Sequence, residues 1–85
     1  MPAYCYLLQC ADGSYYCGWT YDVEQRLAAH QSGRGSRYAR AHLPLKLAYV
    51  EVCEDRAQAQ RREKEIKSLS HAQKELLTKN GSNHG

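Results

Sequence analysis

Five polar side chains in this sequence are of types that together could cleave a phosphodiester bond. Two are phenols in strand-like stretches, two lie one turn apart in a helical stretch, and one is an acid on a later helix: Tyr6, Tyr16, Arg26, His30 and Glu63. Such cleavage requires a base beside the attacking water, positive charge on the developing phosphorane oxygens and a cation at the leaving oxygen. One carboxylate completed by phosphate oxygens and waters suits magnesium, which seldom takes an all-protein cage.

The element that must position the two phenols is a β-hairpin. An Asp-Gly pair separates two runs of aromatic and thiol residues that suit a pleated, half-buried surface. A two-residue loop would turn Tyr6 and Tyr16 to opposite faces of the sheet. A three-residue loop over 11–13, with Gly13 in the left-handed conformation, pairs Leu8 with Tyr16 and turns both phenols to one face. A shared tyrosine site therefore requires the odd loop.

The other three side chains are predicted to lie on two amphipathic helices. The first begins at Asp22, which can cap it, and Arg26 and His30 flank its apolar stripe one turn apart. The second begins at Asp55, and Glu63 falls on its inward stripe. A carboxylate on that stripe is costly unless it is paired, hydrogen-bonded or bound to a metal. With both helices against the sheet, all five polar groups are predicted to face one sheet surface.

The chain is predicted to be one domain over residues 1–79, with a disordered tail over 80–85. The expected elements are strands over 4–10, 14–19 and 45–52 and helices that begin at residues 22, 55 and 70. In the last helix the apolar side chains expected to face inward are Ala72, Leu76 and Leu77.

The positive charge of the chain is unevenly distributed. The formal net charge is +3, yet no acid occurs between Glu24 and Glu51. A glycine-rich loop in that interval carries the arginines expected to bind nucleic acid: Arg34, Arg37 and Arg40. A local basic field favours an anionic partner through phosphate neutralisation and counterion release. A solvated basic loop is the alternative interpretation.

The chain is expected to be cytoplasmic and without a membrane segment. No apolar run approaches the roughly 18 residues of a membrane span, and the start at Met1 has no export signal. The four cysteines are interpreted as small buried hydrophobes in a reducing compartment. A structural zinc site is disfavoured because there is no Cys-x-x-Cys or pair of histidines at helical spacing.

The order and spacing of these residues resemble the GIY-YIG nuclease superfamily. The likeness rests on two tyrosine tripeptides, the helix that carries Arg26 and His30, and the glutamate of the later helix: Cys5-Tyr6-Leu7, Tyr16-Cys17-Gly18 and Arg62-Glu63-Lys64. This likeness covers nearly all of residues 4 to 78. More narrowly, the chain is similar to small bacterial proteins that consist of this domain alone. The resemblance implies an α/β fold of the α+β type, with a central three-stranded antiparallel sheet flanked by helices.

The resemblance also implies an enzyme, a divalent-metal-dependent endonuclease that hydrolyses nucleic-acid phosphodiester bonds. DNA, as a repair or recombination intermediate, is the expected substrate. By the resemblance Glu63 would bind Mg²⁺ or Mn²⁺, and Arg26 would bind the scissile phosphate with His30 as a hydrogen-bonding or proton-shuttling partner. Tyr6 or Tyr16 would orient or deprotonate the attacking water.

Each of these residues also has a purely structural interpretation. The tyrosines could pack in the sheet, and Arg26 and His30 could be an exposed helical pair. Glu63 could form a salt bridge with a neighbouring cation: Arg62, Lys67 or Arg26. The competing functions are a non-catalytic nucleic-acid-binding module that retains the nuclease fold, and a protein-interaction scaffold.

Overall fold

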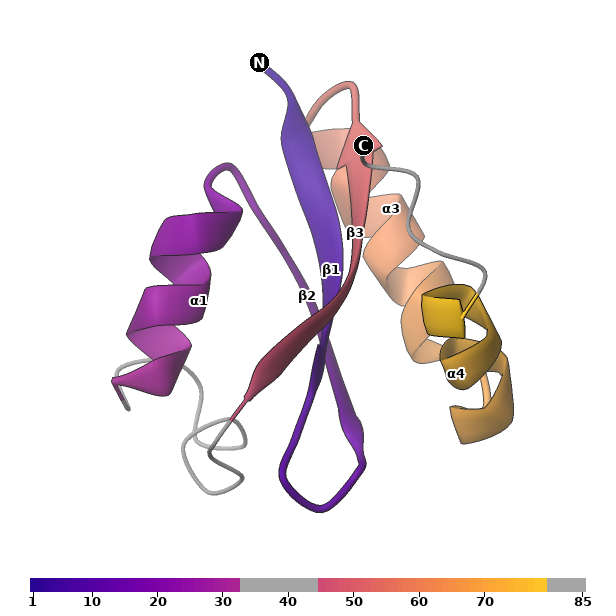
Figure 1. Ribbon diagram of the computed structural model, residues 1–85. Helices are drawn as coiled ribbons and strands as arrows, with labels where there is room; N and C mark the ends of the chain where they lie inside the picture. The colour runs from indigo at the N-terminus through magenta and orange to yellow at the C-terminus, as the bar shows by residue number, and fades with distance from the viewer. Residues whose placement is uncertain (33–44, 80–85) are drawn as a thin grey trace.

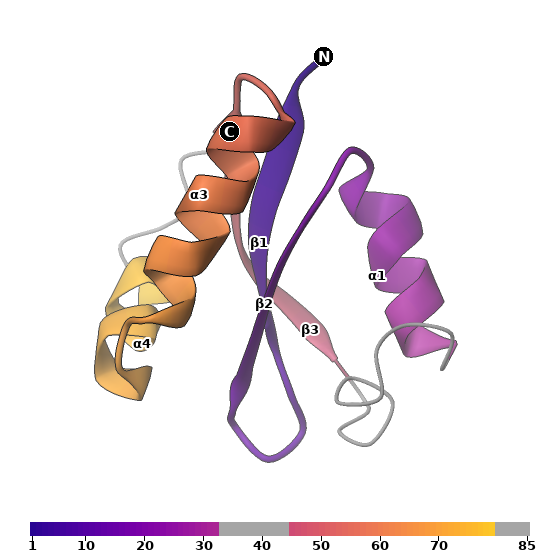
Figure 2. The same ribbon diagram turned by 180° about the vertical axis from the view of Figure 1, so that it is seen from behind.

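The protein is a three-stranded antiparallel sheet with helices on both faces, seen in a computed structural model that describes residues 1–32 and 45–79. The elements in chain order are β1 (Ala3–Gln9), β2 (Tyr15–Thr20), α1 (Val23–Gln31), β3 (Lys46–Cys53), α3 (Arg56–Lys67) and α4 (His71–Lys79). The strand order is β2-β1-β3. Figures 1 and 2 show α1 on one side of the sheet and α3 and α4 on the other. The expected α+β architecture is confirmed.

The β1–β2 hairpin has the odd loop that a shared tyrosine site requires. Leu8 pairs with Tyr16, and the Cys10 N–H donates to the Ser14 carbonyl at 2.8 Å, which leaves three residues in the turn. Gly13 has φ of +89°, in the left-handed region that favours glycine. Because strand side chains alternate between faces, this register turns both phenols to the same side.

Each described helix begins at the cap that the sequence indicated. The side-chain oxygen of each cap accepts a hydrogen bond from the backbone N–H three residues on: Asp22 from Gln25 (3.0 Å), Asp55 from Gln58 (2.9 Å) and Ser70 from Gln73 (3.2 Å). Every such bond satisfies a donor that the first helical turn leaves unpaired. The caps fix the start of α1 and α3, and therefore the position of each polar side chain further along them.

The two faces of the sheet carry different cores. Against α3 the buried side chains are small or aliphatic with one aromatic: Ala3, Cys5, Leu7, Cys17, Tyr49, Cys53, Ala59 and Ile66. Against α1 they include the first phenol: Tyr6, Leu8, Cys10, Leu45 and Val50, with Tyr4, Tyr16, Val23 and Leu27 packed on them. The four cysteines are buried and free, which confirms their interpretation as small hydrophobes.

Helix α4 corrects one expectation. Ala72 is exposed and Leu76 is 57% exposed, whereas Leu77 packs against the core on the α3 side. Consecutive helical residues point about 100° apart, so a short helix that touches the core along a narrow line buries only one of the two leucines. The start of α4 is held at the hairpin, where His71 Nε2 lies 2.9 Å from the Gly13 carbonyl oxygen. Within the described chain no helix has the length and apolar character to cross a membrane.

Candidate active site

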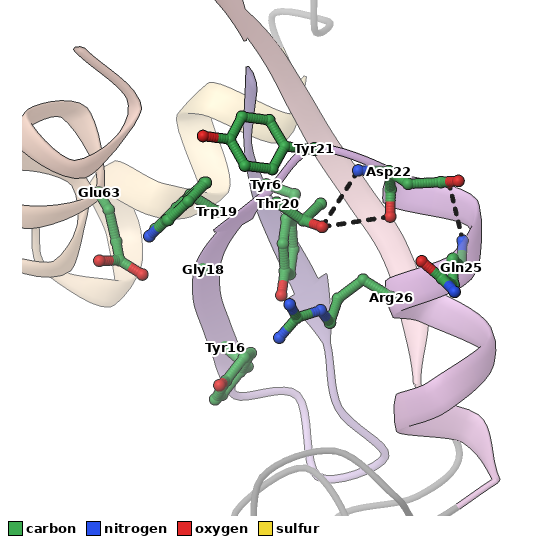
Figure 3. A pocket seen from close by; sticks show the side chains of 10 residues that line it. All are labelled: Tyr6, Tyr16, Gly18, Trp19, Thr20, Tyr21, Asp22, Gln25, Arg26 and Glu63. Atoms are coloured by element: carbon green, nitrogen blue, oxygen red, sulfur yellow. Dashed lines mark hydrogen bonds between the residues drawn. The ribbon is translucent and has the colours of Figure 1, made fainter. Parts of the chain in front are cut away.

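A hollow opens along the outer edge of β2, between α1 and α3 (Figure 3). Its volume is about 390 Å³, toward the lower end of the usual range for ligand pockets. Side chains and backbone from the hairpin and from both helices line it: Tyr6, Tyr16, Gly18, Trp19, Thr20, Tyr21, Asp22, Gln25, Arg26 and Glu63. Four of the five predicted site residues therefore meet in one hollow, and the fifth, His30, lies behind Tyr6.

Glu63 reaches this hollow from the opposite face of the sheet, which corrects the expectation of a single face. Its helix packs on the α3-side core through Ala59 and Ile66, and Cys17 Sγ donates to the Glu63 carbonyl at 3.8 Å. Tyr6 and Tyr16 belong to the other face. The hollow joins the two faces because β2 is an edge strand, around which a side chain from α3 can extend.

Gly18 allows the Tyr6 side chain to lie close against the backbone of β2. It pairs with Tyr6 on the neighbouring strand, and a Cβ atom built on Gly18 would lie 2.6 Å from the Tyr6 hydroxyl oxygen. No real Cβ contact is that short, so any larger residue would displace the phenol. The glycine thus lets the Tyr6 ring lie flat over the edge strand with its hydroxyl at the hollow. The tripeptide Tyr16-Cys17-Gly18 does not by itself indicate this role of Gly18.

Tyr6 and His30 form a buried polar pair beneath the hollow. The Tyr6 hydroxyl lies 3.3 Å from His30 Nε2, and the two residues are 2% and 1% exposed. Burial, and then the charge of Arg26, lower the pKa of His30. Burial and then Tyr16 raise the pKa of Tyr6, and Arg26 offsets part of that. A neutral imidazole and a protonated phenol therefore share this hydrogen bond.

The second ring nitrogen of His30 is unusual. His30 Nδ1 is buried and has no hydrogen-bond partner in the described part of the chain. The ring also meets Tyr16 edge-on, with centroids 5.2 Å apart. An unpaired buried nitrogen costs stability, and such groups concentrate where polar chemistry is needed. The alternative that Arg26 and His30 form an exposed helical pair is wrong, because His30 is buried, although Arg26 is exposed.

Tyr16 and Arg26 present their polar ends to the hollow. Tyr16 is half-buried, in contrast to the fully buried Tyr6. The Arg26 guanidinium points into the hollow toward the Tyr6 hydroxyl (Figure 3) and forms no salt bridge within the described residues. A guanidinium without a carboxylate partner is available for a phosphate, which it can bind through two parallel hydrogen bonds.

Glu63 supplies the carboxylate of the site. Its side chain is 21% exposed, and Oε2 lies 3.7 Å from Lys67 Nζ, so one of the cations named as possible structural partners does approach it. Exposed pairs of this length contribute little. Among the described residues no group of three or more His, Cys, Asp or Glu side chains could hold a metal. One hard oxygen donor at an open hollow fits Mg²⁺ or Mn²⁺, which would take its other ligands from water and phosphate.

An ion-pair clamp that sequence analysis missed holds α3 in place. The Arg62 Nε–H donates to both Glu51 carboxylate oxygens at 2.9 and 3.0 Å, and the Tyr49 hydroxyl donates to the same carboxylate at 2.6 Å. Arg62 also meets Glu65 at 3.2 Å. The clamp ties α3 to β3 immediately beside Glu63. The signal was available, because strand alternation already put Tyr49 and Glu51 on one face.

The three arginines expected to bind nucleic acid, Arg34, Arg37 and Arg40, lie outside the described residues. So does the expected tail over 80–85. The rim of the hollow instead shows two aromatic residues, Trp19 and Tyr21, that sequence analysis did not assign to the site. Their ring centroids are 5.3 Å apart and their planes are perpendicular, at 88°.

The fold and the hollow together define a small α+β domain of the nuclease type. Phenols from the hairpin, a guanidinium from α1 and the Glu63 carboxylate from α3 surround a space open to solvent. A family model described as the GIY-YIG catalytic domain matches residues 2–76. The chain belongs to this family, within the GIY-YIG nuclease superfamily, as the sequence motifs predicted.

Relatives and solved structures agree with this assignment. The chain is 44% identical over 79 residues to a UPF0213 protein from Bacillus cereus, covering 93% of this chain and 82% of the relative. It is 46% identical over 72 residues to a UPF0213 protein from Halobacterium salinarum, covering 85% and 94%. The solution NMR structure of a UPF0213 protein from Bacillus halodurans matches with a TM-score of 0.61 at 38% identity, covering 99% of this chain and 89% of that one. A solution NMR structure from E. faecalis matches with a TM-score of 0.63 at 38% identity, covering 94% and 85%.

Proposed function

We propose that this protein is a divalent-metal-dependent endonuclease that hydrolyses phosphodiester bonds in DNA. The observation that supports this most strongly is the convergence of Arg26 and Glu63, from helices on opposite faces of the sheet, on one hollow with two phenols. Nothing in the packing of either helix requires these side chains to meet. A phosphate bound between the Arg26 guanidinium and a divalent metal ion that Glu63 would hold explains why they do.

The scissile phosphate binds against Arg26. The guanidinium places its positive charge beside the phosphate oxygens, where negative charge grows as the water oxygen adds to phosphorus. Glu63 would hold the divalent cation, which when bound supplies a Lewis acid and a counter-charge for the leaving oxygen. Tyr16 is the phenol that meets the attacking water, because it is half-buried at the hollow whereas Tyr6 is 2% exposed.

The water oxygen forms its bond to phosphorus while the ester bond to the leaving oxygen breaks. Tyr16 orients the water by accepting a hydrogen bond from it, and the water proton passes to the Tyr6 hydroxyl oxygen as Tyr6 gives its own proton to His30 Nε2. The neutral imidazole of His30 can accept the Tyr6 proton through their 3.3 Å contact, so Tyr6 can in turn receive one. Tyr6 and His30 therefore act together as a relay for the proton that hydrolysis releases, and the lowered pKa of His30 favours return of that proton to solvent through the hollow.

The test is metal-dependent nicking of a panel of single-stranded, flapped and branched DNA with Glu63→Gln beside wild type. Loss of the Glu63 carboxylate, which would hold the metal, should reduce cleavage by about a hundredfold or more, a barrier change of several kcal/mol. Glu75→Gln, an exposed carboxylate of α4, is the matched control and should leave cleavage unchanged.

Two outcomes would favour other functions. If none of the DNAs is cleaved with magnesium or manganese but binding is salt-sensitive and indifferent to Glu63→Gln, the protein is a nucleic-acid-binding module that retains the nuclease fold. If it binds no nucleic acid at all, a protein-interaction scaffold becomes the better account.

A further inference from the structure

Trp19 and Tyr21 form an aromatic corner on the rim of the candidate site. Tyr21 is 44% exposed and Trp19 is half-buried, and the two rings meet edge to face with centroids 5.3 Å apart. In Figure 3 the Trp19 indole lies between Glu63 and Tyr21, with its nitrogen end turned toward the carboxylate. The aromatic corner is thus part of the same hollow as the groups that would hold a phosphate.

The corner is rigid as well as accessible. Trp19 lies on β2, and one side of its ring packs against the core on the α3 side. Thr20, the residue between the two aromatics, is buried and accepts a hydrogen bond from the Asp22 N–H at 3.1 Å. Both rings therefore project from a fixed backbone. A ring held in this way loses little conformational freedom when a ligand stacks on it.

The ligand chemistry follows from the neighbours of the corner. An aromatic face beside the Arg26 guanidinium, with Glu63 to hold a metal, fits a group that is flat and aromatic at one end and anionic at the other. In a nucleic acid the phosphate and its own base have that relation. Stacking of a base on an aromatic side chain contributes about 1–3 kcal/mol and tolerates any base, since every base has a π-face.

We propose that Trp19 and Tyr21 form a stacking subsite for one unpaired nucleobase next to the scissile phosphate. This rests on the proposed nuclease function and adds a requirement to it. A base within a duplex has both faces covered by its neighbours, so it must leave the stack to reach the aromatic corner. Substrates whose base is already unpaired at the cleavage position avoid that cost, and they are therefore bound more tightly than a continuous duplex.

The single tryptophan of the chain makes the subsite directly observable, because its emission reports only on Trp19. The probe is a single-stranded oligodeoxynucleotide of about 8 nucleotides, within the range that one small domain covers. It is titrated into the full protein in EDTA, so that binding is measured without cleavage. Two comparison strands carry the same phosphates: one has abasic sites throughout, and one is annealed to its complement.

The intact single strand should quench Trp19 emission, and it should bind about 5- to 150-fold more tightly than the abasic strand. Tyr21→Leu should weaken binding of the intact strand but not of the abasic strand, and Tyr21→Phe should restore it, because phenylalanine keeps the ring. Tyr21 is exposed enough that neither substitution endangers the fold.

Equal binding of the intact and abasic strands, or an equal loss with Tyr21→Leu on both, would overturn the subsite. So would a duplex that binds and quenches as well as the single strand. These outcomes are separable from failure of the nuclease proposal. Quenching by the intact strand without cleavage in magnesium would leave the subsite standing, and cleavage with no dependence on Tyr21 would remove the subsite alone.

Discussion

The two faces of the sheet differ in how their polar groups are satisfied. On the α3 side the Arg62 guanidinium, the Glu51 carboxylate and the Tyr49 hydroxyl bind one another directly. On the α1 side His30 Nδ1 has no partner within the described residues, and Arg26 forms no salt bridge there. The first arrangement holds a helix in place. The second leaves donors and acceptors available for a ligand. The two faces meet at the edge of β2.

This difference suggests a division of work between the faces. The α3 side is a scaffold that presents one carboxylate, Glu63, around the edge strand. The α1 side carries the groups that would touch the phosphate and the water. Substitutions on the α1 side and at the edge should therefore change activity more than stability, and substitutions in the clamp should do the reverse.

Among substitutions of residues other than Arg26 and Glu63, the largest effect is expected from Gly18→Ala. The new Cβ would lie 2.6 Å from the Tyr6 hydroxyl, so the buried phenol must move and its contact with His30 must break. A displacement of about 1 Å at a reacting centre can cost a hundredfold in rate, and overpacking should cost about 1–3 kcal/mol of unfolding free energy. Single-turnover cleavage and denaturant unfolding measure the two.

Gly13→Ala is the matched control for that prediction. It lies in the same hairpin, has no atom within 4 Å of the added Cβ, and is disfavoured only by its φ of +89°. It should lose stability, by about 1 kcal/mol or somewhat more, and keep the cleavage rate of folded protein. Full activity of Gly18→Ala would contradict the claim that Gly18 is needed to position the Tyr6 hydroxyl.

A smaller effect, on stability, is expected from Arg62→Met. The substitution keeps most of the side-chain bulk but leaves the Glu51 carboxylate, among the described residues, with the Tyr49 hydroxyl alone. Because the pair is about one-third exposed, the unfolding free energy should fall by about 1–2 kcal/mol rather than by the larger cost of a buried pair. Arg61→Met, on the exposed side of the same helix, is the control, and equal losses for the two would argue against a clamp.

The smallest effect concerns the pH dependence of stability. Burial and then Arg26 lower the pKa of His30 in the folded state below its ordinary value of 6.5. The unfolded chain therefore takes up a proton first as the pH falls, so the free energy of unfolding should decrease below about pH 6.5 and level off once the folded histidine is protonated.

His30→Gln should flatten that part of the profile, because glutamine does not titrate. Denaturant unfolding between pH 7 and pH 5 measures both proteins. Identical slopes for the two would show that the buried imidazole contributes nothing to acid destabilisation, and the neutral His30 assigned to the proton relay would lose its support.

Local sequence signals predicted the hairpin and the helix starts because each depends on a few neighbouring residues. The Asp-Gly turn with its left-handed glycine determined the register of Tyr6 and Tyr16, and the caps at Asp22 and Asp55 determined where α1 and α3 begin. Glu63 does lie on the inward side of its helix, between Ala59 and Ile66.

The sequence could not show which face of the sheet each helix covers. Helical periodicity places a side chain on its own helix, whereas the face depends on how the connections cross the sheet. Glu63 was therefore expected beside the phenols and instead reaches them around the edge strand. Which side chains of α1 face the sheet, with His30 buried and Arg26 exposed, likewise depends on tertiary packing. The catalytic and nucleic-acid-binding roles of these residues remain predictions.

The central claim is that Arg26 from one face and Glu63 from the other act on one phosphate. A double-mutant cycle in single-turnover cleavage of a flapped DNA tests it, with Arg26→Gln, Glu63→Gln and both together. Each single change should slow cleavage by about 10²–10³-fold, and the double variant should be scarcely slower than the worse single, because groups that act as a unit are strongly non-additive. Losses that multiply would contradict the account, since they would mean that the two residues act independently.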